Sequence, residues 1–309
     1  MIKVVLLAGG VGGAKMAEGF DGLEDVALSV IGNVADDAAF HGLWVSPDID
    51  TLTYSLAGRI DRTQGWGVKD ESHRALEVLK ELGEDTWMTL GDRDFGLHIY
   101  RNQALQRGQS RSEIAAHVAR AFGVESHILL PTDDVVQTRV RVASGWLSFQ
   151  EYFVREQCRP EVLELKYEGV KAATPTKAAL AAIAAADFIV LAPSNPLVSI
   201  TPILEVPGLR AALHAAKAPV WAVSPLIGGK AVKGPADRMM KALGLRADAL
   251  GVAEYYGDLL DGMVIDYADV ELTAAIIAQK KRVICEPTLM ATHDDKVALA
   301  GAIIWAAAQ

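Results

Sequence analysis

The chain has 309 residues, of which 30 are Lys or Arg and 39 are Asp or Glu, so its formal net charge is −9. This acidic balance disfavours a protein that coats nucleic acid, and a hydrophobic content of 51% excludes an extended disordered chain. The length allows one or two domains, or one large α/β unit with an insertion. Cys158 and Cys285 form no CxxC pair, and we expect both to be reduced thiols in a cytoplasmic protein.

Neither end of the chain predicts contact with a membrane. The N-terminus passes directly into glycines, without a basic leader and without about 18 uninterrupted apolar residues. The apolar run at residues 297–308 is too short to cross a bilayer. We expect it to form a C-terminal helix that packs on the core.

Short β-branched runs alternate with Ala/Leu-rich helical stretches, a pattern typical of a parallel sheet with crossover helices. The predicted fold class is therefore α/β, with a Rossmann-like, doubly wound and mostly parallel sheet. The predicted strands are residues 3–8, 26–32, 188–192 and 219–224, which are continuous apolar runs as expected for strands buried on both faces. The predicted helices are residues 71–82 and 203–216.

Residues 134–178 have a different pattern. Residues 135–142 alternate with period two, a turn follows at Gly145, and residues 146–154 resume an extended pattern. This arrangement indicates an antiparallel hairpin. We predict a single α/β unit over residues 1–309, with a smaller β-rich, partly helical insertion at residues 134–178.

A glycine-rich loop, Gly9-Gly10-Val11-Gly12-Gly13, follows the first predicted strand and precedes a helix. Backbone amides in such a loop can approach a phosphate closely, and the helix N-terminus adds a favourable dipole. The loop is neither a GxGxxG motif nor a Walker A motif, and a tight strand-to-helix turn explains it equally well. The loop is therefore either a phosphate-binding site formed by Gly10, Gly12 and Gly13 or a tight turn between a strand and a helix.

Asn33 follows the second predicted strand and precedes Asp36 and Asp37. Dinucleotide dehydrogenases place an acid near this position to hold a ribose, so Asn33 counts against NAD as a ligand. Because the carboxyl ends of parallel strands meet at one edge of a sheet, we expect Asn33 and the glycine loop to face the same ligand.

Two more carboxylates, Asp48 and Asp50, lie beside Pro47. In an extended segment they would point to the same side and bind a hard cation or two hydroxyls of a ligand. Alternatively, Asp50 caps a helix that begins near Thr51. The sequence alone leaves both interpretations open.

Polar loops also occur farther along the chain. Arg93 lies among acids and suits forked contacts with phosphate, although turns and helix caps are an alternative explanation for this segment. Ser194 and Asn195 follow one predicted strand, and Lys230 follows the next. The repetition of such loops favours one polar, phosphate-oriented site.

These residues resemble the 2-phospho-L-lactate transferases, more closely the bacterial branch than the archaeal one. The matching blocks are Gly9-Gly10-Val11-Gly12-Gly13, Gly32-Asn33-Val34-Ala35-Asp36-Asp37, Ser46-Pro47-Asp48-Ile49-Asp50-Thr51, Gly65-Trp66-Gly67, Gly91-Asp92-Arg93-Asp94, Phe149-Gln150-Glu151, Ala192-Pro193-Ser194-Asn195-Pro196 and Gly251-Val252-Ala253-Glu254-Tyr255-Tyr256. They occur in the family's order and together extend over about residues 3–300.

The resemblance implies a cytoplasmic, magnesium-dependent enzyme of coenzyme F(420) biosynthesis, usually a homodimer. Family members transfer a phospho-acid from a guanosine diphosphate-linked donor to the ribityl hydroxyl of Fo (7,8-didemethyl-8-hydroxy-5-deazariboflavin) and release GMP. The carried acid is phospholactate, phosphoenolpyruvate or phosphoglycerate, and the sequence does not distinguish them.

The resemblance also implies roles for particular residues. The family's Fo-contacting acid matches Asp50 and its basic partner matches Arg93. Asp48, Asp50 and Arg93 are the expected catalytic residues, and Asp48 and Asp50 are expected to hold Mg²⁺ or to orient the ribityl hydroxyl. The proposed substrate-binding residues are Gly10, Gly12, Gly13, Asn33, Asp36, Ser194, Asn195 and Lys230.

Some alternatives remain open at the sequence level. A non-catalytic nucleotide- or nucleotide-sugar-binding regulator would keep the glycine loop, whereas the Asp48/Asp50 pair with Arg93 favours the transferase. An NAD-dependent oxidoreductase is disfavoured by Asn33. Trp44 or Trp66 could stack on the deazaflavin, although aromatic side chains more often fill cores. None of the seven histidines has metal-site spacing.

Overall fold

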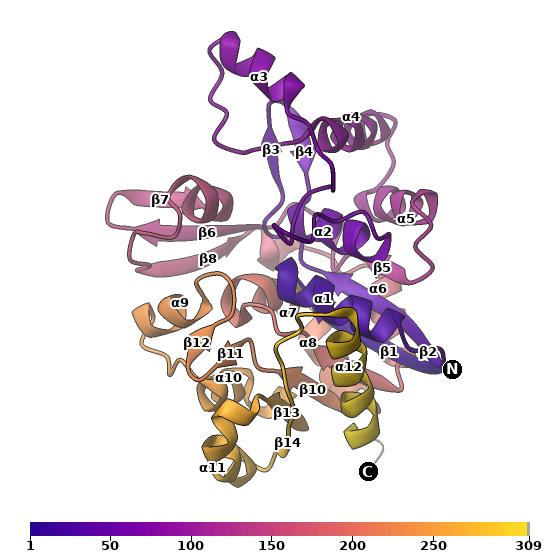
Figure 1. Ribbon diagram of the computed structural model, residues 1–309, viewed down its shortest axis with the longest axis vertical. Coiled ribbons are helices and arrows are strands. Elements are labelled where there is room, and N and C mark those ends of the chain that lie inside the picture. Colours follow the sequence, from indigo (N-terminus) through magenta and orange to yellow (C-terminus); the bar gives the residue numbers. More distant parts are fainter. Residues whose placement is uncertain (308–309) are drawn as a thin grey trace.

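A seven-stranded parallel sheet forms the centre of the computed structural model, which describes residues 1–307 (Figure 1). Its strands are β1 (Ile2–Ala8), β2 (Val26–Gly32), β5 (His127–Leu129), β9 (Phe188–Leu191), β10 (Val220–Val223), β13 (Gly262–Ile265) and β14 (Arg282–Cys285). The spatial order is β14-β13-β10-β9-β1-β2-β5, and every neighbouring pair is parallel. The predicted fold class and the four predicted strands are confirmed.

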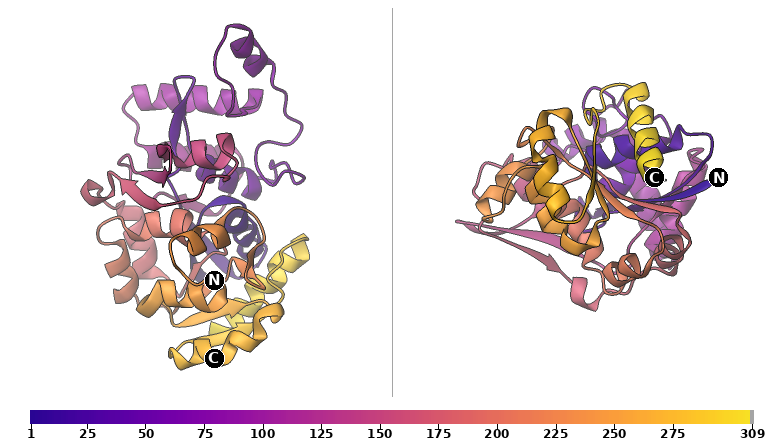
Figure 2. Two further views of the ribbon diagram at one scale, coloured as in Figure 1. Left: turned by 90° about the vertical axis from the view of Figure 1, so that its left-hand side faces the viewer. Right: turned by 90° about the horizontal axis from the view of Figure 1, so that it is seen from below.

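The sheet is covered by helices on both faces, as the view from below in Figure 2 shows. Leu6 of β1 packs in one apolar cluster with α1 (Gly10–Asp21) and α12 (His293–Ala307). Its neighbour Leu7 lies in the opposite cluster, with α6 (Lys177–Ala185), α8 (Leu209–Ala215) and α10 (Ala249–Tyr256). Because alternate strand residues point to opposite faces, continuous apolar runs bury both sides of the sheet.

The predicted helices are present with changed bounds. The C-terminal helix starts earlier than predicted, at His293, and Ala308 lies outside the described residues. The helix predicted at 71–82 is the shorter α3 (Arg74–Glu81). The helix predicted at 203–216 is divided into α7 (Thr201–Leu204) and α8, because Gly208 adopts a φ of +92° directly after Pro207.

A small antiparallel sheet lies within the predicted insertion, in the order β7-β6-β8. It consists of β6 (Gln137–Val142), β7 (Gly145–Ser148) and β8 (Glu164–Glu168). The extended segment predicted over 146–154 is wrong beyond Ser148, because a helical turn, η1 (Glu151–Arg155), follows. The Ser148 amide donates to the Glu151 carboxylate at 2.7 Å and the Glu151 amide donates to Ser148 Oγ at 3.1 Å, a reciprocal cap that starts the turn.

Residues 33–126, between β2 and β5, form a lobe at the top of Figure 1. Its elements are β3 (Ala38–Phe40), β4 (Leu43–Val45), α2 (Pro47–Leu56), α3, α4 (Asp92–Gln106) and α5 (Arg111–Ala121). Two small apolar clusters lie within it, one around Tyr54 and Leu97 and one around Val45 and Phe95. The first of these clusters contains residues of both α2 and α4 and joins the two helices above the sheet.

The remaining elements are short. They are β11 (Leu226–Ile227), β12 (Lys230–Ala231), α9 (Ala236–Ala242), α11 (Thr273–Ala278), and the helical turns η2 (Val170–Ala172), η3 (Pro196–Ile200), η4 (Gly257–Leu259) and η5 (Tyr267–Leu272). Over residues 1–307, every helix is too short or too polar to cross a membrane.

The strand order reverses its direction between β1 and β9. From β1 the chain proceeds outward to β2 and β5, whereas from β9 it proceeds the other way to β10, β13 and β14. Ligands of open α/β sheets bind at such a switch point, outside the carboxyl ends of the strands. The glycine loop after β1 and the Ser194–Asn195 loop after β9 meet there.

Candidate active site

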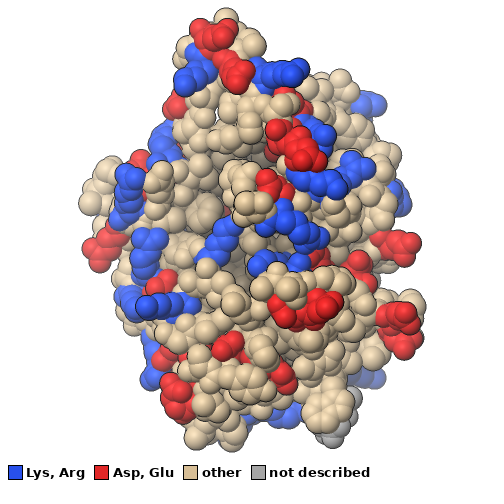
Figure 3. Space-filling view, viewed as in Figure 1, with Lys and Arg blue, Asp and Glu red and all other residues tan. Residues whose placement is uncertain are grey.

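A cavity of about 450 Å³ opens between the carboxyl edge of the sheet and the lobe of residues 33–126. Figure 3 shows the hollow near the middle of this face of the molecule. The wall comes from segments far apart in the sequence: Gly9, Gly10, Val11, Gly12, Asp36, Val45, Pro47, Asp48, Asp50, Thr51, Tyr54, Trp66, Gly67, Met88, Thr89, Leu90, Asp94, His98, Phe149, Gln150, Phe153, Val154, Pro193, Ser194, Asn195, Val198, Ser199, Lys233, Gly234 and Pro235.

The glycine loop packs directly on the loop that follows β9. A Cβ at Gly12 would lie 2.3 Å from the Pro193 carbonyl oxygen, and a Cβ at Gly13 would lie 2.9 Å from Ser194 Oγ. Ser194 Oγ also donates to the Gly9 carbonyl at 2.7 Å. Glycine is therefore required at 12 and 13 for close packing, and Gly13 itself does not line the cavity.

Asp48 connects the glycine loop to the end of β2. Its Oδ1 accepts from the Gly10 amide at 2.8 Å, and its Oδ2 accepts from Asn33 Nδ2 at 2.9 Å. The Gly10 amide, which we predicted to face a phosphate, is thus bonded to a carboxylate. Burial raises the pKa of Asp48 to about 6, although both hydrogen bonds act in the opposite direction.

Asp50 forms a buried ion pair with Arg101 of α4. Arg101 Nη1 lies 3.2 Å from Asp50 Oδ2, and Arg101 Nη2 donates to Oδ1. His98 Nδ1 lies 3.0 Å from Arg101 Nη1 and accepts from it as a neutral imidazole. Burial lowers the pKa of His98 to about 4, which keeps the ring neutral at physiological pH.

Asp48 and Asp50 lie in the first turn of α2, which begins at Pro47. Proline is favoured at the first helical position, and here it starts the helix four residues before the predicted Thr51. The extended geometry considered for the pair is therefore wrong, and Ser46 rather than Asp50 is the N-cap residue. Both carboxylates still line the cavity, one toward the glycine loop and the other toward α4.

Asp36 is buried beside these carboxylates, and its Oδ1 has no hydrogen-bond partner within the described residues. Burial raises the pKa of Asp36 well above the usual range, and the charges of Asp48 and Asp37 raise it further. Two carboxylates that repel each other across a cavity, with one orphaned oxygen, are chemically suited to a divalent cation.

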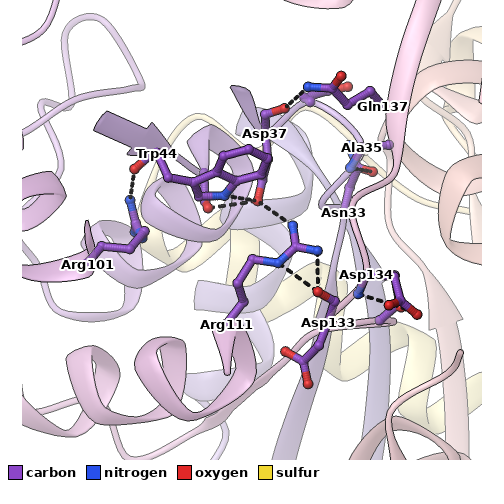
Figure 4. A network of polar contacts seen from close by, with 12 residues as sticks. Asn33, Ala35, Asp37, Trp44, Arg101, Arg111, Asp133, Asp134 and Gln137 are labelled. Carbon is purple, nitrogen blue, oxygen red and sulfur yellow. Dashed lines mark hydrogen bonds and ion pairs between the residues drawn. The ribbon is translucent and has the colours of Figure 1, made fainter. Parts of the chain in front are cut away.

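Asp37 points away from the cavity into a separate network, shown in Figure 4. Its Oδ2 accepts from Ser46 Oγ at 2.8 Å and from Trp44 Nε1 at 3.2 Å, and it lies 3.8 Å from Arg111 Nη1. Trp44 is therefore held outside the cavity. This network joins the β3–β4 hairpin to Arg111 of α5, and Trp66 is the tryptophan that lines the cavity.

Asp94 forms another acidic part of the wall. Tyr54 Oη donates to Asp94 Oδ1 at 2.7 Å, and burial raises the pKa of this carboxyl to about 6. Apolar and aromatic side chains lie nearby, including Trp66, Leu90 and Phe149. A wall of this kind suits a flat aromatic ligand that carries a polar side chain.

Two predicted site residues lie elsewhere. Arg93 donates from Nη1 to the Lys69 carbonyl at 2.8 Å and lines a second hollow on the other side of Tyr54. Lys230 is exposed on β12, and Lys233, three residues later, lines the cavity instead. Ser194 and Asn195 line the cavity as expected, and Asn33 reaches it through Asp48. The roles of Arg93 and Lys230 remain predictions.

Sequence reasoning did not find Arg101, His98 or Tyr54. A signal for them exists, because Asp94, His98 and Arg101 are spaced four and three residues apart and share one face of α4. Asp50 and Tyr54 are likewise four residues apart on α2. Once α2 is known to begin at Pro47, these spacings bring the five side chains to one interface between two helices.

Comparisons with known proteins agree on one family. The family model of 2-phospho-L-lactate transferase CofD matches residues 4–302. A phosphoenolpyruvate transferase of Kitasatospora aureofaciens is 42% identical over 286 residues, covering 90% of this chain and 89% of that protein. A 2-phospho-L-lactate transferase of Methanosarcina acetivorans is 39% identical over 270 residues, covering 86% of each chain.

A solved structure agrees in fold. A Bacillus halodurans protein of the UPF0052 family superposes with a TM-score of 0.62 over 98% of this chain and 100% of its own, at 15% sequence identity. At that identity the similarity concerns the fold alone.

Proposed function

The chain belongs to the family of 2-phospho-L-lactate transferase CofD, and on that premise we propose that it transfers a phosphorylated three-carbon acid from a guanosine diphosphate-linked donor to Fo. The observation that carries the proposal is the arrangement of the cavity. The glycine loop lies at the switch point of the sheet, aromatic side chains lie on the facing wall, and carboxylates lie along the same cavity.

The reaction needs two ligands that meet at one phosphorus. The ribityl hydroxyl oxygen of Fo forms a bond to the phosphorus that carries the acid, and the anhydride bond to the guanylate breaks. The electron pair of that bond leaves with GMP, and the hydroxyl gives up its proton. Charge develops on the phosphoryl oxygens and on the departing guanylate, so positioning and charge stabilisation dominate such a step.

The glycine loop is the proposed site of the donor diphosphate. Backbone amides at a helix N-terminus have no partner inside the helix, and this holds for Val11 and Gly12 at the start of α1. These amides and the helix dipole favour an anion there. The amide of Gly10 already donates to Asp48, so fewer amides of the loop can bind the diphosphate than the sequence predicts.

Asp50 is the proposed acceptor of a hydrogen bond from the ribityl hydroxyl. Its ion pair with Arg101 fixes the carboxylate within the wall. Because that pairing already occupies both oxygens of the carboxylate, we assign Asp50 to orienting the hydroxyl first and to accepting its proton second. Trp66 and Phe149 provide an aromatic surface beside it for the deazaflavin rings.

Magnesium is part of the proposal, and the residues present fit it. Asp36 and Asp48 would hold the ion, because Asp36 Oδ1 is buried without a partner among the described residues and the charge of Asp48 helps to raise the pKa of Asp36. When bound, Mg²⁺ neutralises the charge of the diphosphate. Among residues 1–307 there is no cluster of three acidic, His or Cys side chains that could hold a metal alone, and Mg²⁺ commonly combines one or two carboxylates with substrate phosphates. Asp50, paired with Arg101, is the less suitable of the two predicted ligands.

The names of the relatives include two different acids and do not select one for this chain. Those named above act on phosphoenolpyruvate or 2-phospho-L-lactate by their names, with similar identity to this chain. The proposal keeps both acids, and phosphoglycerate, as candidates. The homodimer and the cytoplasmic location that the family resemblance implies stay predictions.

Release of GMP tests the proposal. Purified protein with Mg²⁺, Fo and each guanylated donor should release GMP, measured by chromatography, only when Fo and donor are both present. Release without Fo would indicate hydrolysis of the donor. Absence of GMP with all three donors would contradict the proposed transfer.

A further inference from the structure

The cavity has one basic end, formed by Lys233. This residue precedes α9 and lines the cavity together with Gly10, Val11 and Gly12. Among the described residues it is the single Lys or Arg in the wall, while the charged side chains elsewhere in the wall are Asp36, Asp48, Asp50 and Asp94. Figure 3 shows basic side chains gathered around the hollow in the middle of this face.

Lys233 has no acidic partner within ion-pair distance in the part of the chain that the structure describes. Its Nζ donates to the Gln64 carbonyl. Burial lowers the pKa of Lys233, and the nearby charge of Lys15 lowers it further. Lys15 itself donates to the Met290 carbonyl at 2.8 Å. An ammonium that lines the cavity without a counter-charge gains more from an arriving anion than a lysine already held in an ion pair does.

Three loops meet at this ammonium. A Cβ on Gly65 would lie 3.3 Å from Lys233 Nζ and 3.2 Å from Val11 Cγ1, so the Gly65 loop touches both the lysine and the glycine loop. The free amides of Val11 and Gly12 belong to the same corner. Amide donors, a helix N-terminus and an unpaired cation thus lie within one small region of the wall.

We propose that Lys233 binds the diphosphate of the guanylated donor, through a non-bridging oxygen of the phosphate that leaves as GMP. The inference rests on the function proposed above and assigns it a further residue. When the anhydride bond breaks, the electron pair passes to the guanylate oxygen, and the ammonium stabilises the charge that develops there. Lys233 donates this bond and retains its proton.

The contact between Lys233 and the donor also affects the loop of residues 64–66, which forms part of the cavity wall. An ammonium has three protons, so Lys233 can donate to the Gln64 carbonyl and to the donor at once. Trp66 lies two residues after Gln64 and lines the cavity. Binding of the donor therefore holds the loop that carries Trp66 in place for Fo.

The test compares Lys233→Gln with Lys233→Arg and with Lys241→Gln, a matched exposed lysine on α9. GDP and guanosine are the probes, and their affinities are measured by calorimetry with Mg²⁺ present. Lys233→Gln should weaken GDP binding by about 10- to 100-fold, the loss typical of one charge-assisted hydrogen bond. Guanosine binding should not change. Lys233→Arg should recover part of the loss, and Lys241→Gln should bind GDP like the unmodified protein.

The outcomes separate this inference from the proposed function. If the unmodified protein binds GDP and Lys233→Gln binds it equally well, the lysine assignment is overturned while the transferase stands. If Lys233→Gln loses guanosine and GDP in equal proportion, its role is structural and the assignment is again overturned. If the unmodified protein binds no GDP, the proposed function and this inference fail together.

Discussion

Arg101 of α4 and Asp50 of α2 form a buried ion pair, with Arg101 Nη1 3.2 Å from Asp50 Oδ2. Arg101 Nη1 also lies 3.3 Å from the Trp44 carbonyl. The pair therefore joins α2, α4 and the β3–β4 hairpin behind the cavity wall. It fixes the orientation of the carboxylate that we assign to the acceptor hydroxyl.

Replacing Arg101 should destabilise the protein. Arg101→Met leaves the buried Asp50 carboxylate without its cation, and breaking a buried pair in this way costs about 3–5 kcal/mol. Urea denaturation measures the loss in free energy of unfolding. Arg107→Gln, at the exposed end of the same helix, should lie within about 0.5 kcal/mol of the unmodified protein. Equal stability of the two variants would show that the pair contributes little.

Asp50→Asn should lower turnover with little effect on the donor. The amide cannot accept the hydroxyl proton and orients the hydroxyl less well, so we expect a loss of about 10²- to 10⁴-fold in kcat. Affinity for GDP should be unchanged, because the carboxylate that contacts the glycine loop is Asp48 and not Asp50. Steady-state kinetics with Fo and donor at saturation provide the measurement. Full turnover of a folded Asp50→Asn protein would remove Asp50 from the mechanism.

The buried carboxyls of Asp48 and Asp94 should contribute stability to the metal-free protein that is lost as pH rises from about 4 to about 7. Burial raises the pKa of Asp48 and Asp94 to about 6 in the folded state, whereas an unfolded aspartate has a pKa of about 3.9. Between these values the folded state binds more protons, so their contribution is present at low pH and is lost as pH rises through about 6. Thermal melts at a series of pH values measure this slope.

Asp94→Asn should make that slope shallower, because the amide does not ionise. Asp258→Asn, a substitution at an exposed carboxyl, is the matched control and should keep the slope. The same slope in Asp94→Asn as in the unmodified protein would contradict the burial argument.

Removal of Mg²⁺ should abolish turnover, and addition of Mg²⁺ should raise the melting temperature near pH 7.5. Both effects follow from two carboxylates that repel each other until a cation binds. Asp36→Asn removes the orphaned oxygen and should increase the Mg²⁺ concentration needed for half-maximal activity by at least about tenfold. Asp85→Asn, at an exposed position, should leave that concentration unchanged. An Asp36→Asn protein with the original Mg²⁺ dependence would exclude Asp36 as a ligand.

Much of the fold was predictable because buried parallel strands have an unmistakable composition. The apolar runs at β1, β2, β9 and β10 are bounded by glycine and proline, and the structure confirms them within one or two residues. The break between α7 and α8 was missed because the apolar spacing continues across Pro207 and Gly208. The Ser148–Glu151 cap was a visible helix signal that the strand-like pattern around it outweighed.

The site was predictable where it depends on strand ends and less so where it depends on helix pairing. The glycine loop, Asp36, Asp48 and the Ser194–Asn195 loop follow strands or adjoin them, so sheet geometry brings them together. Arg101 reaches Asp50 across 51 residues of sequence through the packing of α2 on α4, which periodicity does not encode. The same packing places Arg93, near the start of α4, outside the cavity.

The most direct test of the transfer is mass spectrometry of the product formed from Fo and each guanylated donor in the presence of Mg²⁺. The proposed function predicts a new species with the mass of Fo plus one phospho-acid, formed in equal amount to GMP, with at least one of the three donors. Recovery of unmodified Fo with every donor, or release of GDP in place of GMP, would contradict it.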